Sequence, residues 1–158
     1  MGANLPNALD AYNKLITSEV GIFSSHRQHE IGLTINETLK GLAELLKITK
    51  KRANSLGLVC TLTEDDMKKM LSACGGVCYL SGIPFSNKEI KGKRIRPWVP
   101  SVDRINSNEG YTLENCRLVC AYINVAMNQF GEKFLLYVAR AITKKSMERD
   151  MDMLLMDS

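Results

Sequence analysis

The stretch VDRINSNEGYTLENC, residues 102–116, sets an aspartate beside an arginine, then a turn rich in Asn and Gly, then another asparagine before a cysteine. On either side of the turn, residues 99–105 and 115–120 alternate apolar with polar positions, which is typical of strands. The turn NSNEGYT would join these strands as a hairpin. Asn115 follows this turn directly, so its side-chain amide is well placed to tie the hairpin loop together.

A helix is predicted after the hairpin, and it begins at Ala121 and carries Asn124 in its first turn. A hairpin folded onto this helix would bring Asp103 and Asn124 together in a surface cleft. Each offers a hard oxygen of the kind that Mg²⁺ prefers. Asp and Asn are also common in turns for local reasons, so spacing alone leaves a purely structural role open.

Before the hairpin, residues 34–54 place apolar side chains at helical spacing and end in a basic segment. The apolar piece LVCTL, residues 58–62, is a strand candidate. Thr63 is placed to cap a helix that runs to about Ala73. Residues 86–97 then lead into the hairpin. We expect them to form a basic loop, because their Gly, Pro and charged residues argue against regular structure.

The two ends of the chain are also predicted to be helical. A first helix is expected over residues 4–20, followed by irregular structure over 21–33. Gly131 divides the helix at Ala121 from a last helix over residues 132–143. The predicted fold class is α+β, with a β-hairpin packed on a helix and further helices at both ends.

Positive charge is concentrated in two segments of this 158-residue chain, which has 21 Lys and Arg against 17 Asp and Glu. Residues 47–52 hold four basic groups and no acid, and residues 88–104 hold six against two acids. One such run is usually a solvated face, but two runs around a candidate site favour a polyanionic substrate. The candidate DNA contacts are Lys50, Lys51, Arg52, Lys91, Lys93, Arg94, Arg96 and Arg117.

No apolar run approaches the roughly 18 residues needed to span a bilayer. Residues 1–14, MGANLPNALDAYNK, lack the apolar centre of a secretory signal. We therefore expect a cytoplasmic protein with no membrane partner. Its five cysteines are then expected as reduced thiols or metal ligands and not as disulfides.

Three segments together resemble the HNH endonucleases, a family with a ββα-metal core. They are RANSLGLVCTLTEDDMKKML, CYLSGIPFS and RPWVPSVDRINSNEGYTLENCRLVCAYINVAMNQFGEKF. The resemblance implies a nuclease core over residues 51–145, a helical extension over 1–50, and a helix end or tail over 146–158. It also implies cleavage of DNA, most simply double-stranded, with Mg²⁺ or Mn²⁺, in a bacterial or phage setting.

Carried over by position, the resemblance makes Asp103 and Asn124 the metal ligands and Asn115 the residue that orders the loop. Asn128, one turn after Asn124, would assist them. Arg104 stands where the family has the histidine that activates water. Because arginine stays protonated, we expect it to clamp the scissile phosphate instead.

The general base is left open between metal-bound hydroxide, bulk water and a tyrosine. Tyr79 and Tyr111 are the nearest phenols by the family pattern, although packing is the commoner role for each. Both imidazoles, His26 and His29, fall outside the matched region, where a surface or cap role is expected.

Structural zinc is not expected, because each Cys-x-x-Cys knuckle of the zinc-bearing relatives is half missing. Cys78 is followed by Ser81 and Cys120 by Ile123 at the second knuckle positions. Adding Cys74 and Cys116 would give four thiolates, but not at the usual knuckle spacing. Cys78 and Cys120 are therefore expected to be small buried residues.

The sequence thus favours a metal-dependent DNA endonuclease of HNH type. A non-catalytic DNA-binding or interaction module with the same fold is the alternative, and it predicts binding without metal. A zinc-stabilised interaction domain is a third possibility. The oligomeric state is left open.

Overall fold

A computed structural model describes residues 35–87, 89, 91–92 and 96–156. The helix predicted over 4–20, the irregular segment 21–33 with both histidines, and the basic residues Lys93 and Arg94 lie outside these ranges. In chain order the elements are α3 (Ile35–Ser55), α4 (Glu64–Ala73), β1 (Pro100–Arg104), β2 (Cys116–Cys120), α5 (Ala121–Met127) and α6 (Gly131–Met156).

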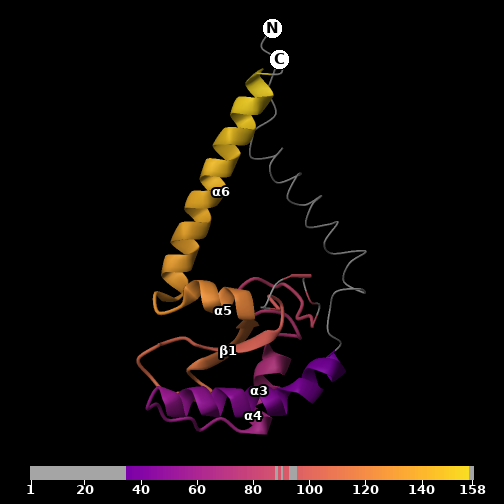
Figure 1. The fold of residues 1–158 in the computed structure, drawn as a ribbon, viewed down its shortest axis with the longest axis vertical. Helices are drawn as coiled ribbons and strands as arrows, with labels where there is room; N and C mark the ends of the chain where they lie inside the picture. The colour runs from indigo at the N-terminus through magenta and orange to yellow at the C-terminus, as the bar shows by residue number, and fades with distance from the viewer. Residues whose placement is uncertain (1–34, 88, 90, 93–95, 157–158) are drawn as a thin grey trace.

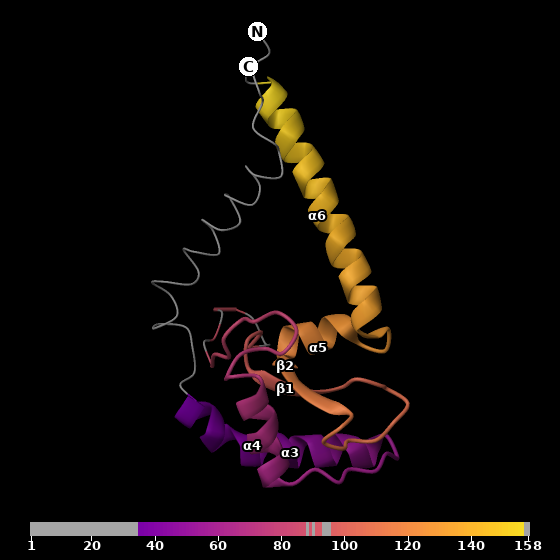
Figure 2. The same cartoon turned by 180° about the vertical axis from the view of Figure 1, so that it is seen from behind.

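The hairpin of β1 and β2 lies between two helical layers. Helices α3 and α4 pack against it on one side and α5 on the other, while α6 contacts α5 and then leads away from the rest (Figure 1, Figure 2). This arrangement confirms the predicted α+β class and the predicted order of hairpin followed by helix. None of the helices in the described part of the chain is long and apolar enough to cross a membrane.

The two predicted strands are confirmed, each within a residue or two of its expected bounds. β1 and β2 pair antiparallel, with Val102 opposite Leu118 and Asp103 opposite Arg117. Since side chains alternate along a strand, these two pairs project to opposite faces of the hairpin. Val102 and Leu118 enter the hydrophobic core, and Asp103 and Arg117 lie on the other face.

The core is one cluster that draws on every element up to α5. Both halves of α3 contribute to it through Leu42, Leu46 and Ala53. The predicted boundary at residues 50 and 51 therefore falls inside a single packed helix. The other buried apolar residues include Leu62, Met67, Leu71, Phe85, Val119 and Met127.

Thr63 caps the start of α4, as its sequence position predicts. The Thr63 hydroxyl accepts the backbone N–H of Asp66 at 3.2 Å, and the Asp66 carboxylate accepts the backbone N–H of Thr63 at 3.1 Å. This reciprocal pair is a capping box, which satisfies two backbone donors that the first helical turn leaves unpaired. The prediction of Thr63 as the N-cap is confirmed.

Two secondary-structure predictions need correction. The segment 58–62 forms no strand. Leu58 N donates to Ala53 O (3.0 Å), and an isolated bridge to Tyr111 is made by Tyr111 N to Val59 O (2.8 Å) and Thr61 N to Tyr111 O (3.0 Å). The last helix continues to Met156 instead of ending at residue 143. Residues 144–156 contain neither Gly nor Pro and are rich in helix formers, so nothing stops the helix.

The contact between Gly110 and Val59 gives a stability prediction. A Cβ at Gly110 would lie 2.5 Å from the Val59 carbonyl oxygen, whereas a Cβ at Gly41, inside α3, would meet nothing within 4 Å. We expect Gly110→Ala to lower the free energy of unfolding by about 1–3 kcal/mol through overpacking. Gly41→Ala should raise it by about 0.5–1 kcal/mol. Urea denaturation measures both, and equal effects of the two substitutions would contradict the close approach.

Candidate functional site

The hairpin loop is tied together by the side chain of Asn115. Its Oδ1 accepts the backbone N–H of Asn106 at 2.9 Å, and its Nδ2 donates to the carbonyls of Asn106 (3.1 Å) and Gly110 (2.9 Å). These are the contacts expected of a residue that orders the loop. Asn115 is buried, and it uses three of its four hydrogen-bonding positions on loop backbone, so it supports the site without facing a substrate.

A buried arginine joins the hairpin to α6. Arg117 Nε donates to Asp103 Oδ2 at 2.9 Å, and Arg117 Nη1 donates to Glu132 Oε2 at 2.8 Å. The Asp103 and Arg117 side chains are only 11% and 9% exposed, against 39% for Glu132. Sequence reasoning missed this cluster, because Glu132 belongs to a helix that returns to the hairpin only in the folded chain.

The titration of this cluster follows from its burial. Burial raises the pKa of the Asp103 carboxyl above its usual value, and the hydrogen bond and charge of Arg117 oppose that rise. Burial also disfavours the charged form of Arg117, but the hydrogen bonds to Glu132 and Asp103 outweigh it and raise the pKa of the guanidinium. Arg117 therefore keeps its proton at any working pH.

Two predictions are corrected by this cluster. Asp103 was expected in a surface cleft, but it is 9% exposed and ion-paired. Arg117 was expected to contact DNA, but its guanidinium is buried between two carboxylates, which leaves it little surface for a phosphate. Arg117 is better described as an internal cation of the site.

Asn124 reaches β1 from α5. Its Nδ2 donates to Ser101 Oγ at 2.8 Å and to the Val102 carbonyl at 3.0 Å. Ser101 and Asp103 are two residues apart on one strand, so they share a face of the hairpin. α5 thus places Asn124 against the strand and the face that carry Asp103.

The donor chemistry of this pair fits a hard divalent cation. One Asp103 oxygen bonds Arg117, while Asn124 Oδ1 accepts no hydrogen bond from the described part of the chain. A carboxylate and an amide oxygen suit Mg²⁺, which takes few protein ligands and completes its octahedron with water and phosphate. Among the described residues, no three His, Cys, Asp or Glu side chains gather as a metal-binding group.

A shallow pocket lies beside Asn124. It has a volume of about 280 Å³. It brings together three predicted site residues, Arg52 from α3 and Asn124 and Asn128 from α5. The residues that line it are Arg52, Ser101, Ala121, Asn124, Val125 and Asn128.

Arg104 is engaged with the hairpin loop. Its Nη1 donates to the carbonyls of Ser107 (2.7 Å) and Glu109 (2.9 Å), and its guanidinium lies 4.9 Å from the centre of the Tyr111 ring. Strand alternation directs it away from Asp103. One end of the guanidinium thus holds the loop, and the described residues make no hydrogen bond to its Nη2 or Nε.

The two candidate tyrosines differ in access. Tyr111 is 2% exposed and packs in the hydrophobic core. Tyr79 is 60% exposed, and its ring lies 5.6 Å from the Arg117 guanidinium. Of the two phenols, only Tyr79 is exposed beside the Asp103 cluster.

The remaining basic candidates lie on the surface where the structure describes them. Lys50, Lys51 and Arg52 are exposed along the last turns of α3, and Lys91 is exposed in the basic loop. Arg96 is exposed and pairs with Glu89.

The cysteines that replace the zinc knuckles are buried, as predicted. Cys78 and Cys120 are 1% and 0% exposed, and Cys78 Sγ accepts the backbone N–H of Cys120 at 3.2 Å. This bond fastens the loop after α4 to the end of β2. Cys74 and Cys116 do not join them in a group of metal-ligating side chains.

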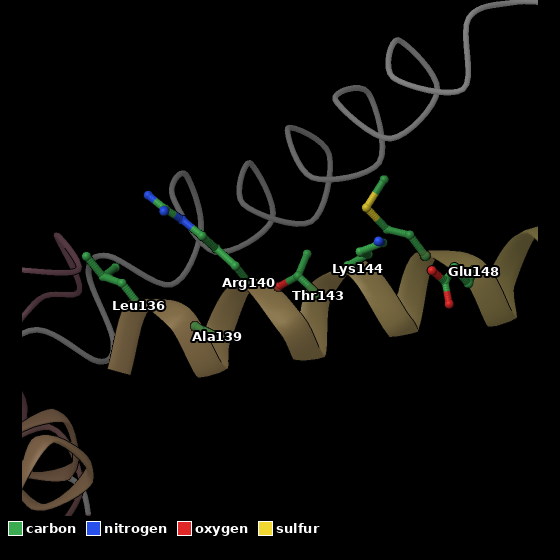
Figure 3. A pocket seen from close by; sticks show the side chains of 7 residues that line it. Leu136, Ala139, Arg140, Thr143, Lys144 and Glu148 are labelled. Carbon is green, nitrogen blue, oxygen red and sulfur yellow. The ribbon is translucent and has the colours of Figure 1, made fainter. Parts of the chain in front are cut away.

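A second cavity, of about 510 Å³, runs along α6, and its described lining residues come from that helix alone. Figure 3 shows Leu136, Ala139, Arg140, Thr143, Lys144 and Glu148 along it. It shares no lining residue with the pocket beside Asn124.

Comparisons with known proteins add one structural likeness. A scan against protein-family models and a search of curated proteins found no match. The chain is similar to a chain from a structure of the rare-cutting HNH restriction endonuclease PacI, with 23% sequence identity and a TM-score of 0.48. The match covers 69% of this chain and 81% of that chain.

The buried cluster predicts a pH-dependent stability defect. Arg117→Met leaves Asp103 buried without its cation, which should lower the free energy of unfolding at pH 7–8 by about 3–5 kcal/mol. Loss of Arg117 also raises the folded-state pKa of Asp103 further above its unfolded value. An acid with a raised folded pKa regains stability as the pH falls, so the defect should shrink between roughly pH 7 and pH 4.

Denaturation of Arg117→Met and the parent at several pH values measures this trend. Arg117→Met combined with Asp103→Asn is the matched control, because it removes both charges and should recover much of the stability at pH 7. A defect that stays constant across pH would show that Asp103 is not the group left unpaired.

Proposed function

We propose that this protein is a metal-dependent DNA endonuclease of HNH type that hydrolyses a phosphodiester bond. The observation that carries the proposal is the placement of Asn124, on the helix after the hairpin, against the strand that presents Asp103. The amide-tied loop of Asn115 and the basic end of α3 support it. A bacterial or phage origin follows from the sequence resemblance alone.

In this proposal Asp103 and Asn124 hold one divalent cation, Mg²⁺ or Mn²⁺. The ion would supply positive charge at the scissile phosphate in a position fixed by the fold. Arg117 favours the ionised form of Asp103 and orients its carboxylate, since the pair is buried and 2.9 Å apart. The exposed basic groups near the end of α3 attract the DNA backbone.

Tyr79 is the phenol that remains as a candidate base, because it is exposed beside the Asp103 and Arg117 pair. Bulk water and a hydroxide on the metal are the alternatives. A phenol needs its pKa of about 10 lowered to act near neutral pH. Tyr79→Phe separates these cases, because it removes the hydroxyl and keeps the ring over Arg117.

A non-catalytic DNA-binding module is the second candidate, and one observation favours it. Arg117 already supplies a cation to Asp103, so the site is partly neutralised without metal. This candidate predicts DNA binding that EDTA does not change and no cleavage with any divalent ion.

The metal site is tested by Asp103→Asn. Alanine at this position would orphan the buried Arg117, whereas asparagine keeps the volume and a hydrogen-bond acceptor for Arg117 Nε. Plasmid DNA incubated with Mg²⁺ or Mn²⁺ should be nicked or linearised by the parent and left intact in EDTA. Asp103→Asn should lose on the order of 10²-fold or more in rate, because the anionic metal ligand is gone.

The control is Asp65→Asn, which removes an exposed acid on α4 that pairs with Lys68. Its cleavage rate should equal that of the parent. Full activity of Asp103→Asn, with an unchanged melting curve, would mean that the metal site has been misplaced.

Arg104 gives a separate prediction. If its free guanidinium edge clamps the phosphate, Arg104→Ala should lose about 10²–10³ in rate, as for one transition-state charge stabiliser. Arg104→Lys should recover only part of the lost cleavage rate. The compact lysine ammonium cannot bond two loop carbonyls and a phosphate in one plane, as a guanidinium can. Cleavage and thermal melting are measured together. A fall in melting temperature with no loss of rate would assign Arg104 to the loop alone.

A further inference from the structure

The pocket beside Asn124 is lined by hydrogen-bond donors from three separate segments. Arg52 comes from the last turn of α3, Ser101 from β1 and Asn128 from the end of α5. The Ser101 hydroxyl accepts a hydrogen bond from Asn124 and so keeps its own proton to donate. None of the residues that line the pocket in the described chain is acidic. Such a donor set suits an anion.

Arg52 has its charge available for this pocket. The described part of the chain gives its guanidinium no ion pair and no hydrogen bond, whereas Arg96, Arg104 and Arg117 are all engaged. The carboxyl end of α3 carries the negative end of the helix dipole, which amounts to roughly half a charge. The full charge of Arg52 outweighs it, so the pocket stays positive.

Asn128 holds an unusual backbone conformation at the pocket rim. Its φ is 43°, and it is the one non-glycine residue with positive φ in the described chain. With ψ at −129°, this is not the αL conformation that Asn tolerates, and residues with a Cβ rarely adopt it. Glycine would suit the backbone better, so the presence of Asn points to a use for its side chain.

We propose that Arg52, Ser101 and Asn128 form a subsite for a second DNA backbone phosphate, next to the phosphate that the proposed metal site addresses. The inference rests on the proposed function, because the pocket adjoins Asn124 and its ligand is identified as DNA only through the proposed nuclease activity. It makes α3 part of the DNA-binding surface. The phosphate at this subsite is held in place and not cleaved, so it fixes the register of the backbone across the site.

The test measures binding of a fluorescent DNA duplex in EDTA across a range of salt concentrations. Arg52→Gln should weaken binding roughly tenfold at low salt, the size of one charge-assisted hydrogen bond. It should also reduce the slope of log affinity against log salt by about 0.9, the value for one lost phosphate contact. Arg149→Gln, the same change at an exposed residue on distal α6, should alter neither.

Asn128→Gly removes the side chain while relieving the backbone, so a loss of affinity cannot come from misfolding. It should lower affinity without changing the salt slope, because no charge is lost. Combined with Arg52→Gln, its effect should be smaller than in the parent, since two groups that share one phosphate are coupled. Arg52→Lys should keep the slope.

Because EDTA prevents cleavage, this experiment is separate from the test of nuclease activity. A parent that cleaves DNA, with Arg52→Gln indistinguishable from Arg149→Gln, would overturn the subsite and leave the proposed function standing. If Arg52→Gln reduces the slope but the parent never cleaves DNA, the subsite is supported and the nuclease proposal is overturned. Additive effects of Arg52→Gln and Asn128→Gly would also overturn the shared phosphate.

Discussion

The ion pair between Arg117 and Asp103 is the contact on which the candidate site depends. It links the two strands of the hairpin at the register position where they face each other, and Glu132 extends it to α6. A carboxylate this buried is tolerated only when a cation and hydrogen bonds compensate its lost hydration. Arg117 therefore opposes the effect of burial on the pKa of Asp103 and fixes where its carboxylate points.

Local sequence signals were enough for the scaffold of the site. The alternation around residues 102–116 predicted the hairpin, the position of Asn115 after the turn predicted its bonds to the loop backbone, and Thr63 predicted the start of α4. The paired residues of the hairpin are 12 to 20 positions apart, and the other two contacts join residues within ten positions. Each of these features follows from a short-range sequence pattern, so the sequence alone predicts it.

The role of Arg117 could not be predicted in the same way. Its pairing depends on strand register, and a slip of one residue would have placed it on the opposite face, in the core. Its second partner, Glu132, lies beyond a helix and a turn. As an isolated basic residue beside a nuclease motif, Arg117 has the signature of a DNA contact, whereas in the fold it is buried between two carboxylates.

The charge of the cluster bears on whether Arg117 replaces a metal ion. Asp103 and Glu132 contribute two negative charges and Arg117 one positive charge, so the three residues carry a net charge of −1. An approaching phosphate would meet this net negative charge at short range, where the repulsion is only partly screened. A divalent cation on Asp103 and Asn124 would change the local charge to +1 and reverse the sign of that interaction. The internal arginine alone cannot do this, because it is already outnumbered by the carboxylates that bury it.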